Sequence, residues 1–306
     1  MLEPDHDAVS PVWAVVVVYE PEPEVEENLC ALLAQCERVV VADNGCPVGL
    51  RARWSALPGV EWLPMGGNVG VGEALNRGLA RVCAQGGAWA LTFDQDSRPE
   101  PGMVAALWRA AQANPGAAVV CPRIHEAGSN PAAYRWVARH PKLPLLFRRI
   151  PCTGSDLPAV TMAVTSGSLF DLAAWNRLGR FDSGFFIDYV DTEYCLRAIR
   201  AGMRIAVAGD AVLRHRLGAR ARHLLLGREF RSMNHAPFRH YYMARNRAAT
   251  WRRHALAVPH WALFDLCFMG FNFSRVLLFE RQRGAKVRAI LRGTWHGILG
   301  KTGPMP

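Results

Sequence analysis

The sequence predicts an α/β fold built on a doubly wound, mostly parallel sheet with helices on both faces. Three observations lead to this prediction. Half of the 306 residues are hydrophobic and only 20% are charged, as in a folded globular protein. Apolar runs of strand length alternate with segments of helical periodicity. The runs are continuous rather than alternating, as expected for strands that are buried on both faces.

The first elements follow this alternation closely. Residues 12–19 form a run rich in valine that ends at a Glu-Pro pair, which predicts a buried strand. Residues 23–35 carry leucines and valine at helical spacing. A second strand is predicted over 38–42 and ends at the turn sequence Asp43-Asn-Gly, and a short helix is predicted over 51–57.

The same alternation continues to the middle of the chain. Residues 60–63 predict a third strand, and the glycine-rich segment after it leads into a helix over 73–84. A fourth strand is predicted over 89–93, because its apolar run stops abruptly at acidic residues. A helix over 103–114 and a strand over 119–121 complete this part.

The rhythm is lost over residues 125–159, which contain five prolines and predict an irregular excursion over the sheet. Residues 160–170 again resemble a strand. A helix is predicted over 191–201, because Gly202 supplies the usual glycine after a helix C-terminus. A last short strand is predicted over 205–208.

Charge divides the chain into two parts. The formal net charge is +10, and the segment 211–258 contains eleven arginines but only one acidic residue, Glu229. We therefore divide the chain into a core, 1–210, and a basic C-terminal extension, 211–306. An excess of this size predicts an anionic partner, which could be a nucleotide, a nucleic acid or a lipid headgroup.

Residues 259–279 are rich in aromatic and aliphatic side chains, but Asp265 and Arg275 argue against a transmembrane helix. Two interpretations stay open: a helix lying in a lipid headgroup layer, and a helix packed into the core. The N-terminus lacks a signal-peptide pattern, and the eight cysteines form no Cys-x-x-Cys pair. We therefore expect a cytoplasmic protein that can associate peripherally with the inner face of the plasma membrane.

The strongest chemical signal is Asp94-Gln-Asp96, which follows directly on the fourth predicted strand. Ligands of α/β sheets bind beyond the carboxyl ends of the strands. Two acids at this position repel each other unless a cation or a ligand joins them. Mg²⁺ or Mn²⁺ carrying a diphosphate would meet that need, whereas the alternative is an ordinary solvated turn.

Five motifs occur in a fixed order, and the set resembles glycosyltransferase family 2. They are Asp43 after the second strand, Gly67-Asn68-Val-Gly70, Asp94-Gln-Asp96-Ser, Phe185-Phe-Ile-Asp188-Tyr-Val-Asp191-Thr-Glu193, and His215-Arg-Leu-Gly218. Over residues 12–250 the chain is most similar to bacterial rhamnosyltransferases that use dTDP-L-rhamnose. The resemblance implies a GT-A type fold and an inverting, metal-dependent transfer.

The resemblance also implies roles for the residues that bind donor and metal. Asp96 and His215 would hold the metal ion, and Asp94 would share it or hold the ribose. Asp43 would contact the nucleobase, with a turn cap as its alternative. Asn68 would contact the diphosphate or the sugar of the donor. In this interpretation the C-terminal extension completes the site through the loop that carries His215.

The acidic cluster before residue 200 supplies the candidate base. Asp191 corresponds to the family's general base, and Asp188 and Glu193 would place hydroxyl groups of the acceptor or sugar. Many relatives have a second acid where this chain has Val190, so Glu193 is the alternative base. Asp191 could otherwise be a simple N-cap of its helix, an interaction worth about 1 kcal/mol.

Three further residues complete the candidate site. Arg245, in the sequence Tyr-Tyr-x-x-Arg-Asn, could pair with a diphosphate oxygen through its guanidinium fork, or it could be a solvated helix residue. Ser166 and Gly167 lie on a predicted strand and would line the donor sugar.

The leading hypothesis is therefore an enzyme that transfers L-rhamnose from dTDP-L-rhamnose to a hydroxyl of a bacterial cell-surface glycan or its lipid-linked precursor. A second hypothesis keeps the enzyme but changes the donor to UDP-N-acetylglucosamine or a galactofuranose nucleotide. A third treats the chain as a basic nucleic-acid-binding protein without catalytic activity, which predicts binding that falls steeply with salt.

Overall fold

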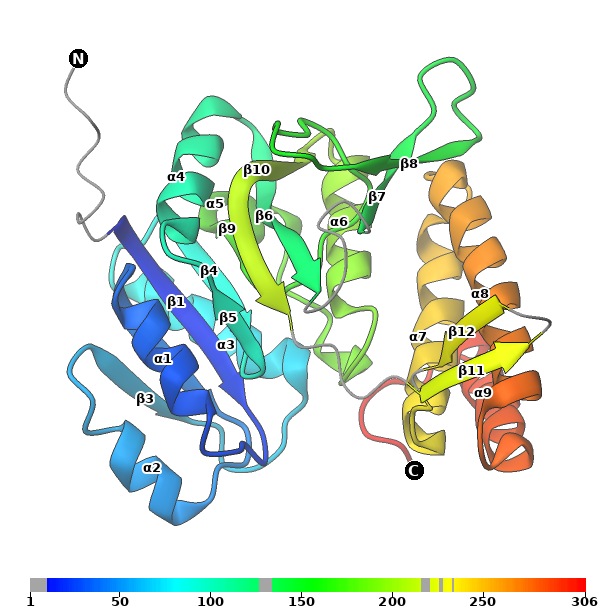
Figure 1. The fold of residues 1–306 in the computed structure, drawn as a ribbon, viewed down its shortest axis with the longest axis horizontal. Coiled ribbons are helices and arrows are strands. Elements are labelled where there is room, and N and C mark those ends of the chain that lie inside the picture. Colours follow the sequence, from blue (N-terminus) through cyan, green and yellow to red (C-terminus); the bar gives the residue numbers. More distant parts are fainter. Residues whose placement is uncertain (1–9, 127–133, 216–220, 226–227, 233) are drawn as a thin grey trace.

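A computed structural model describes residues 10–126, 134–215, 221–225, 228–232 and 234–306. Its centre is an eight-stranded sheet with the strand order β3-β2-β1-β4-β9-β6-β10-β5 (Figure 1). The strands are β1 (Ser10–Val18), β2 (Cys36–Asp43), β3 (Val60–Pro64), β4 (Trp89–Asp94), β5 (Ser97–Pro99), β6 (Ala117–Glu126), β9 (Ser168–Asp171) and β10 (Arg204–His215).

The sheet is mostly parallel, as predicted. β1 pairs in parallel with both β2 and β4, β2 with β3, and β6 with β10. The short strand β9 is inserted antiparallel between β4 and β6, and β5 runs antiparallel to β10 at the edge. The carboxyl ends of β1, β2 and β4 therefore meet at one edge of the sheet, where the sequence places its acidic turns.

Helices cover both faces of the sheet, as predicted. They are α1 (Val25–Leu33), α2 (Val48–Trp54), α3 (Val71–Ala84), α4 (Met103–Ala113), α5 (Leu172–Leu178) and α6 (Val190–Arg200). Alternate residues of β1 enter two separate cores. Val15 and Val17 pack with residues of α3, α5 and α6, whereas Val16 and Val18 pack with residues of α1, α2 and α4. This burial on both faces explains the unbroken valine run.

The predicted excursion over 125–159 is wrong in part, because it contains a β-hairpin. Its strands β7 (Arg135–Arg139) and β8 (Phe147–Pro151) pair antiparallel, and residues 127–133 of the excursion lie outside the described residues. The predicted strand over 160–170 is also too long, since only its end belongs to β9. Gly167 has φ +74°, a left-handed conformation that forms a turn rather than a strand.

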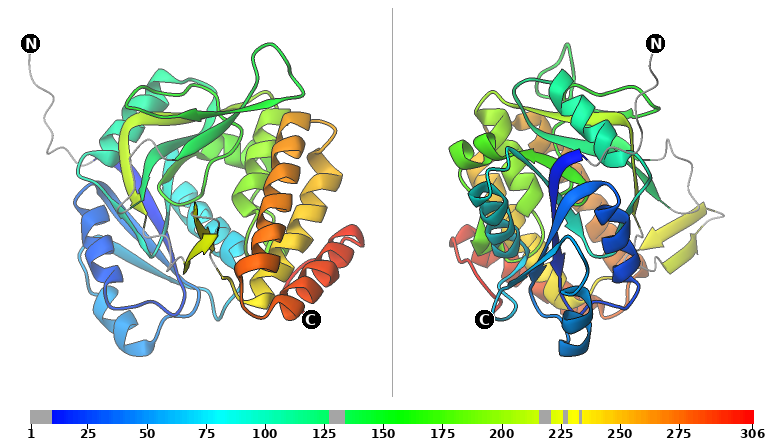
Figure 2. Two further views of the ribbon diagram at one scale, coloured as in Figure 1. Left: turned by 45° about the vertical axis from the view of Figure 1, so that its right-hand side comes forward. Right: turned by 90° about the vertical axis from the view of Figure 1, so that its left-hand side faces the viewer.

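Three helices gather at the side of the molecule away from β3 and α2 (Figures 1 and 2). They are α7 (Pro237–His254), α8 (Pro259–Phe279) and α9 (Arg283–Ile298), and α9 packs closely along α7. Gly293 and Gly297 permit this approach, because a Cβ at either position would come within 2.3 Å of a carbonyl oxygen on α7. A short hairpin, β11 (Ala221–Leu225) and β12 (Arg228–Ser232), precedes α7.

Helix α8 is long and apolar enough to cross a membrane by length and composition alone. Only 17% of its most apolar window is buried within the molecule, which is far less than expected of a core helix. Asp265, on the buried side of α8, accepts hydrogen bonds from Tyr189 and Trp251 at 2.6 and 2.7 Å. These polar contacts fix α8 against α7 and the start of α6.

Candidate active site

A cleft of about 520 Å³ opens at the carboxyl ends of β1 and β4. Its other walls are the loop before α3, the segment before α6, and the first turn of α7. This volume lies within the range of small-molecule binding sites. Four aspartates line the cleft: Asp94, Asp96, Asp188 and Asp191.

The turn that carries Asp94 and Asp96 is fixed by its neighbours. The backbone N–H of Asp94 donates to Ser166 Oγ at 3.0 Å, and the Ser166 hydroxyl donates to Ser97 Oγ at 2.9 Å. Gln95 pairs with both the N–H and the carbonyl of Tyr19, at 2.9 and 3.0 Å. The ends of β1 and β4 are therefore held together directly beneath the acidic side chains.

The carboxylate of Asp94 lies in an unfavourable environment for its charged form. Burial and the charges of Asp96 and Asp191 together raise the pKa of Asp94 to about 7, and the charge of Arg239 opposes this rise. Asp94 has no side-chain hydrogen bond to the described residues. A half-buried carboxylate that bonds no described side chain and lies next to two other acids is an arrangement that a bound cation would stabilise.

Two asparagines shape the opposite wall. Asn68 Oδ1 accepts hydrogen bonds from Asn44 Nδ2 and from the N–H of Gly70, both at 3.0 Å. Asn44 Oδ1 in turn accepts the N–H of Val69 at 2.8 Å. This pairing links the turn after β2 to the loop before α3, and both asparagines line the cleft.

The acidic segment before α6 has a strained backbone. Phe186, Asp188 and Tyr189 have φ values of 63°, 63° and 65°, which residues other than glycine rarely adopt. Each such residue costs on the order of 1–3 kcal/mol unless its surroundings enforce it. The strain turns the chain so that Asp188 and Asp191 both face the cleft opposite Asp94.

Asp191 stands in the first turn of α6. Its Oδ1 accepts a hydrogen bond from the N–H of Thr192 at 2.6 Å. Burial and the charge of Asp188 raise the pKa of Asp191 to about 6, although the hydrogen bonds from Thr192 oppose this rise. A carboxylate with a raised pKa is a better proton acceptor than an ordinary aspartate and is still largely ionised at neutral pH.

Helix α7 holds the strained segment in place. The amide of Asn246 lies 2.8, 2.8 and 2.9 Å from the carbonyl oxygens of Phe185, Ile187 and Asp188. The guanidinium of Arg245 donates to the carbonyls of Gly184 and Phe185 at 2.8 and 2.9 Å. Buried carbonyls are thus satisfied by side chains instead of by regular secondary structure.

The glycine-rich loop braces the same segment from the other side. The N–H of Val71 donates to the carbonyl of Phe186 at 2.7 Å. A Cβ at Gly70 would lie 2.7 Å from that oxygen, so only glycine permits this close approach.

Several residues expected in the site lie outside the cleft. Asp43 is buried, and its carboxylate accepts the N–H groups of Gly45 and Cys46 and the Trp62 indole, and it pairs with Arg51 at 2.7 Å. These four partners fill the capacity of a carboxylate. In this structure Asp43 therefore has the contacts of a turn cap, and its role toward the nucleobase stays a prediction.

Glu193 and Arg245 are also turned away from the cleft. Glu193 is buried and pairs with Arg197 at 2.8 Å and His254 at 3.3 Å. Burial alone would raise its pKa, but the hydrogen bond from His254 and the charge of Arg197 lower it overall. Arg245 is 1% exposed, and its guanidinium is bonded to backbone carbonyls. Neither Glu193 nor Arg245 therefore lines the cleft.

Ser166 and Gly167 lie below the cleft floor. Ser166 orients Asp94, as described above, and Gly167 packs where a Cβ would lie 2.9 Å from Leu213. Their neighbour Thr165 lines the cleft itself. Both residues thus shape the floor without reaching the space where a donor would bind.

The expected metal ligands are brought together in part. No group of three His, Cys, Asp or Glu side chains among those described is arranged to hold a metal ion. Asp94 and Asp96 lie together, and His215 at the end of β10 is the Cα partner of Ser97, next to Asp96. The side chain of His215 and all of Gly218 lie outside the described structure. The donor chemistry of two free carboxylates fits a hard divalent ion.

The sequence analysis assigned no role to five residues that shape the site: Asn44, Gln95, Phe238, Arg239 and Asn246. Gln95 and Asn44 are adjacent to acids that were selected, and their own side chains offered no separate signal. Arg239 was one member of a long basic run. Only the position of the first turn of α7 against the cleft distinguishes it from the others.

Comparison with known proteins gives the family. The model of glycosyl transferase family 2 matches residues 13–179, more than half of the chain. The chain is 25% identical to "dTDP-rhamnosyl transferase RfbF" of Shigella flexneri, over 96% of this chain and 97% of that protein. It is 29% identical to "N-acetylglucosaminyl-diphospho-decaprenol L-rhamnosyltransferase" of Mycobacterium tuberculosis, over 66% and 75% of the two chains.

Solved structures show the same fold at low sequence identity. The structure of S. aureus TarS 1-349 with UDP-GlcNAc superposes with a TM-score of 0.58 at 16% identity, covering 92% of this chain and 81% of that one. The structure of GalNAc-T7 with UDP, GalNAc and Mn²⁺ superposes with a TM-score of 0.59 at 13% identity. That match covers 79% of this chain and 47% of the GalNAc-T7 chain.

The hydrogen bonds of Asn246 predict a large effect of its removal. Replacing Asn246 by Ala leaves three carbonyls of the strained segment without this donor and should lower the free energy of unfolding by about 2–4 kcal/mol. Asn114→Ala is the control, because Asn114 donates to a single carbonyl at the end of α4. Chemical denaturation measures both. Equal losses for the two variants would contradict the proposed support of the segment.

The raised pKa of Asp94 predicts a stability change with a defined sign. The folded protein holds the proton of Asp94 more tightly than the unfolded chain does, so its ionisation destabilises the fold as pH rises from about 4 to 7. In EDTA at pH 8, Asp94→Asn should therefore raise the free energy of unfolding by about 1 kcal/mol or more, with a corresponding rise in Tm. The gain should be smaller at pH 5, where Asp94 of the unchanged protein is protonated. The exposed Asp210→Asn is the control, and an Asp94→Asn variant without a gain would contradict the assignment.

Proposed function

Because the chain belongs to glycosyltransferase family 2, we propose that it transfers L-rhamnose from dTDP-L-rhamnose to a hydroxyl of a cell-surface glycan or its lipid-linked precursor. The observation that carries a transferase function is the convergence of Asp94, Asp96, Asp188 and Asp191 on one cleft. They come from two segments about ninety residues apart. The choice of rhamnose is supported by the names of the two relatives and by the ordered motifs.

Asp191 acts as the general base in this proposal. It removes the proton from the acceptor hydroxyl as that oxygen attacks the anomeric carbon, and the nucleoside diphosphate leaves from the opposite face, which inverts the configuration. Asp188 accepts a hydrogen bond from a sugar hydroxyl. Asp94 and Asp96 would hold a divalent ion, Mg²⁺ or Mn²⁺, which supplies positive charge to the departing diphosphate.

The proposal for the donor is tested by hydrolysis. The protein is incubated with dTDP-L-rhamnose, UDP-N-acetylglucosamine or UDP-galactofuranose, and the release of nucleoside diphosphate is measured with Mg²⁺, with Mn²⁺ and with EDTA. We expect release from dTDP-L-rhamnose that EDTA abolishes. Release from one of the other donors alone would show that the donor sugar is not rhamnose. Turnover that is unchanged in EDTA would contradict the proposed dependence on a metal ion.

Nucleic-acid binding is a weaker explanation of the basic extension. Four carboxylates around the cleft would repel a polyanion, and Arg245 and Arg247 of the extension are engaged in internal hydrogen bonds. The basic extension is instead suited to an anionic lipid layer.

We propose that α8 and the β7–β8 hairpin bind to the membrane surface from the cytoplasmic side. On α8 the side chains of Phe271 and Leu278 are 52% and 57% exposed, and at the hairpin tip Leu145 is 65% exposed. Phe147 of the hairpin packs against Phe264 of α8 with ring centroids 5.4 Å apart, so the two elements form one apolar surface. Exposed arginines flank it on β8 and α9, as in proteins that bind anionic lipids.

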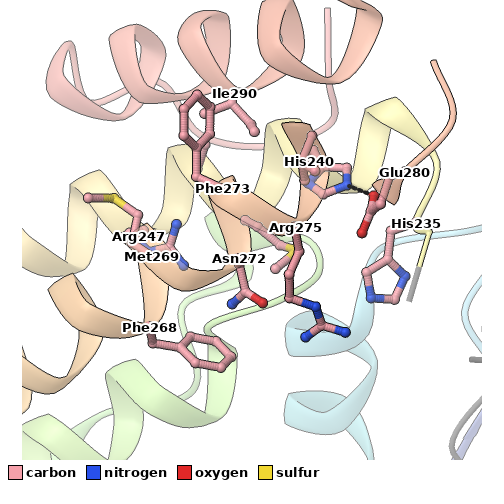
Figure 3. A pocket seen from close by; sticks show the side chains of 13 residues that line it. His235, His240, Arg247, Phe268, Met269, Asn272, Phe273, Arg275, Glu280 and Ile290 are labelled. Carbon is pink, nitrogen blue, oxygen red and sulfur yellow. Dashed lines mark ion pairs between the residues drawn. The ribbon is translucent and has the colours of Figure 1, made fainter. Parts of the chain in front are cut away.

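A small pocket lies between α7, α8 and α9 (Figure 3). Its volume is about 190 Å³, and Phe268, Phe273 and Ile290 line it together with Arg275 and Asn272. His240 and Glu280 form an ion pair at 3.4 Å at one end when the histidine is protonated. An apolar pocket with a cationic side chain at its edge is suited to the boundary between acyl chains and headgroups.

Changing Asp191 to Asn should abolish transfer and preserve donor binding, because the amide cannot accept the proton from the acceptor. For the unchanged enzyme, kcat/KM should fall as pH drops through about 6, since protonation of Asp191 removes the base. Steady-state kinetics and calorimetric titration with dTDP measure the two effects. A variant that loses nucleotide binding together with turnover would mark Asp191 as structural.

The membrane proposal predicts the effect of two charges. The double change Phe271→Glu and Leu278→Glu should reduce binding to vesicles of phosphatidylglycerol and phosphatidylcholine by roughly tenfold or more, because both charges would enter the headgroup layer. Val48→Glu is the control, since Val48 is 76% exposed on the distant helix α2. Cosedimentation measures binding, and unchanged binding of the double variant would refute the proposal.

A further inference from the structure

The acidic side chains of the cleft would repel a nucleoside diphosphate. Four aspartates line it, and Arg239 is the one Lys or Arg side chain among the described residues of its walls. A diphosphate carries at least two negative charges and would approach these acids closely. A cation on the protein is therefore needed in addition to any metal ion that the acids hold.

Arg239 stands in the first turn of α7, at the mouth of the cleft. Its guanidinium contacts both oxygens of Asp188, with the shortest N–O distance at 3.2 Å. Charged pairs of optimal geometry have N–O distances of about 2.7–2.9 Å, so this contact is long. The side chains of Arg239 and Asp188 are 40% and 16% exposed, and a long ion pair whose arginine is open to solvent costs little to break.

The other arginines near the cleft are engaged differently. Arg245 is bonded to backbone carbonyls, and Arg247 pairs with buried Asp265 at 3.1 Å and with the Tyr189 hydroxyl at 2.7 Å. The guanidinium of Arg239 has Asp188 as its sole hydrogen-bond partner within the described structure. It is thus the arginine that can turn to a new anion without breaking the fold.

The position of Arg239 also reaches the other acids. Its charge lowers the pKa of Asp94, and both residues line the same cleft, so the guanidinium lies within electrostatic range of that carboxylate. An anion between Arg239 and the Asp94–Asp96 turn would lie across the cleft. If that turn holds a metal ion, a diphosphate there would contact a cation on each side, the guanidinium of Arg239 on one and the metal ion on the other.

We infer that Arg239 binds the diphosphate of the donor by exchanging its carboxylate partner, Asp188, for phosphate oxygens. The inference rests on the proposed function, since it requires a nucleotide sugar in this cleft. The exchange also frees the carboxylate of Asp188, which then accepts a hydrogen bond from a sugar hydroxyl. Without the donor, the ion pair keeps both charges compensated.

A structural role is the alternative, in which Arg239 only steadies Asp188 and its strained backbone. The two roles differ in how Arg239 and Asp188 are coupled. If Arg239 only steadies Asp188, its removal has no effect once Asp188 is neutral. If Arg239 binds phosphate, its removal weakens diphosphate binding whether or not Asp188 is charged.

The experiment is a double-mutant cycle read by calorimetric titration with dTDP, UDP and thymidine in the presence of Mg²⁺. We expect Arg239→Gln to weaken binding of the preferred nucleoside diphosphate roughly tenfold or more and to leave thymidine binding unchanged. Asp188→Asn should strengthen diphosphate binding, because it removes the competing anion. Arg239→Gln in the Asp188→Asn background should again weaken it.

Arg53→Gln is the matched control, because Arg53 forms an exposed pair with Glu26 at 2.6 Å, away from the cleft. It should bind the nucleotides as the unchanged protein does, and melting temperatures verify that every variant is folded. Loss of the Arg239 effect in the Asp188→Asn background, or unchanged binding by Arg239→Gln, would overturn the inference and leave the proposed function intact. Failure of the unchanged protein to bind any nucleoside diphosphate would overturn both.

Discussion

The hydrogen bonds from Asn246 and Arg245 to the strained segment before α6 are the interaction on which the site depends. Three non-glycine residues with positive φ bring Asp188 and Asp191 to face the acids of β4. Such a backbone is unfavourable in isolation. Side chains of α7 satisfy its carbonyls on one side, and the loop at Gly70 braces it on the other. The C-terminal helix α7 therefore supports one wall of the cleft.

Electrostatics gives the second constraint. Asp94 and Asp191 both have raised pKa values, because burial and neighbouring acids disfavour their charged forms. The protein retains this unfavourable cluster where a cation and a diphosphate would relieve it. In the proposed mechanism the same features would bind a metal ion and the donor and would activate an acceptor hydroxyl. The ionised acids therefore lower the stability of the folded protein at this edge of the sheet, and a bound cation would compensate for this cost.

The arrangement also connects chemistry with location. Asp265 of α8 accepts hydrogen bonds from Tyr189 in the strained segment and from Trp251 in α7. The helix that presents its apolar side chains outward is therefore bonded, through its inner side, to the residues next to Asp188. An acceptor anchored in a lipid layer would reach the cleft along this side of the molecule. The membrane proposal and the transferase proposal use the same group of helices.

The sequence by itself determined the parallel sheet, the helices on its two faces and the turn that carries Asp94 and Asp96. These follow from local patterns: apolar runs, helical spacing and acids at strand ends. It did not distinguish residues by the direction in which they face. Asp43, Glu193 and Arg245 have the expected types at the expected positions, but their side chains are buried among internal partners. Arg239 lies in the cleft because α7 packs against a segment fifty residues earlier, and only tertiary packing decides such contacts.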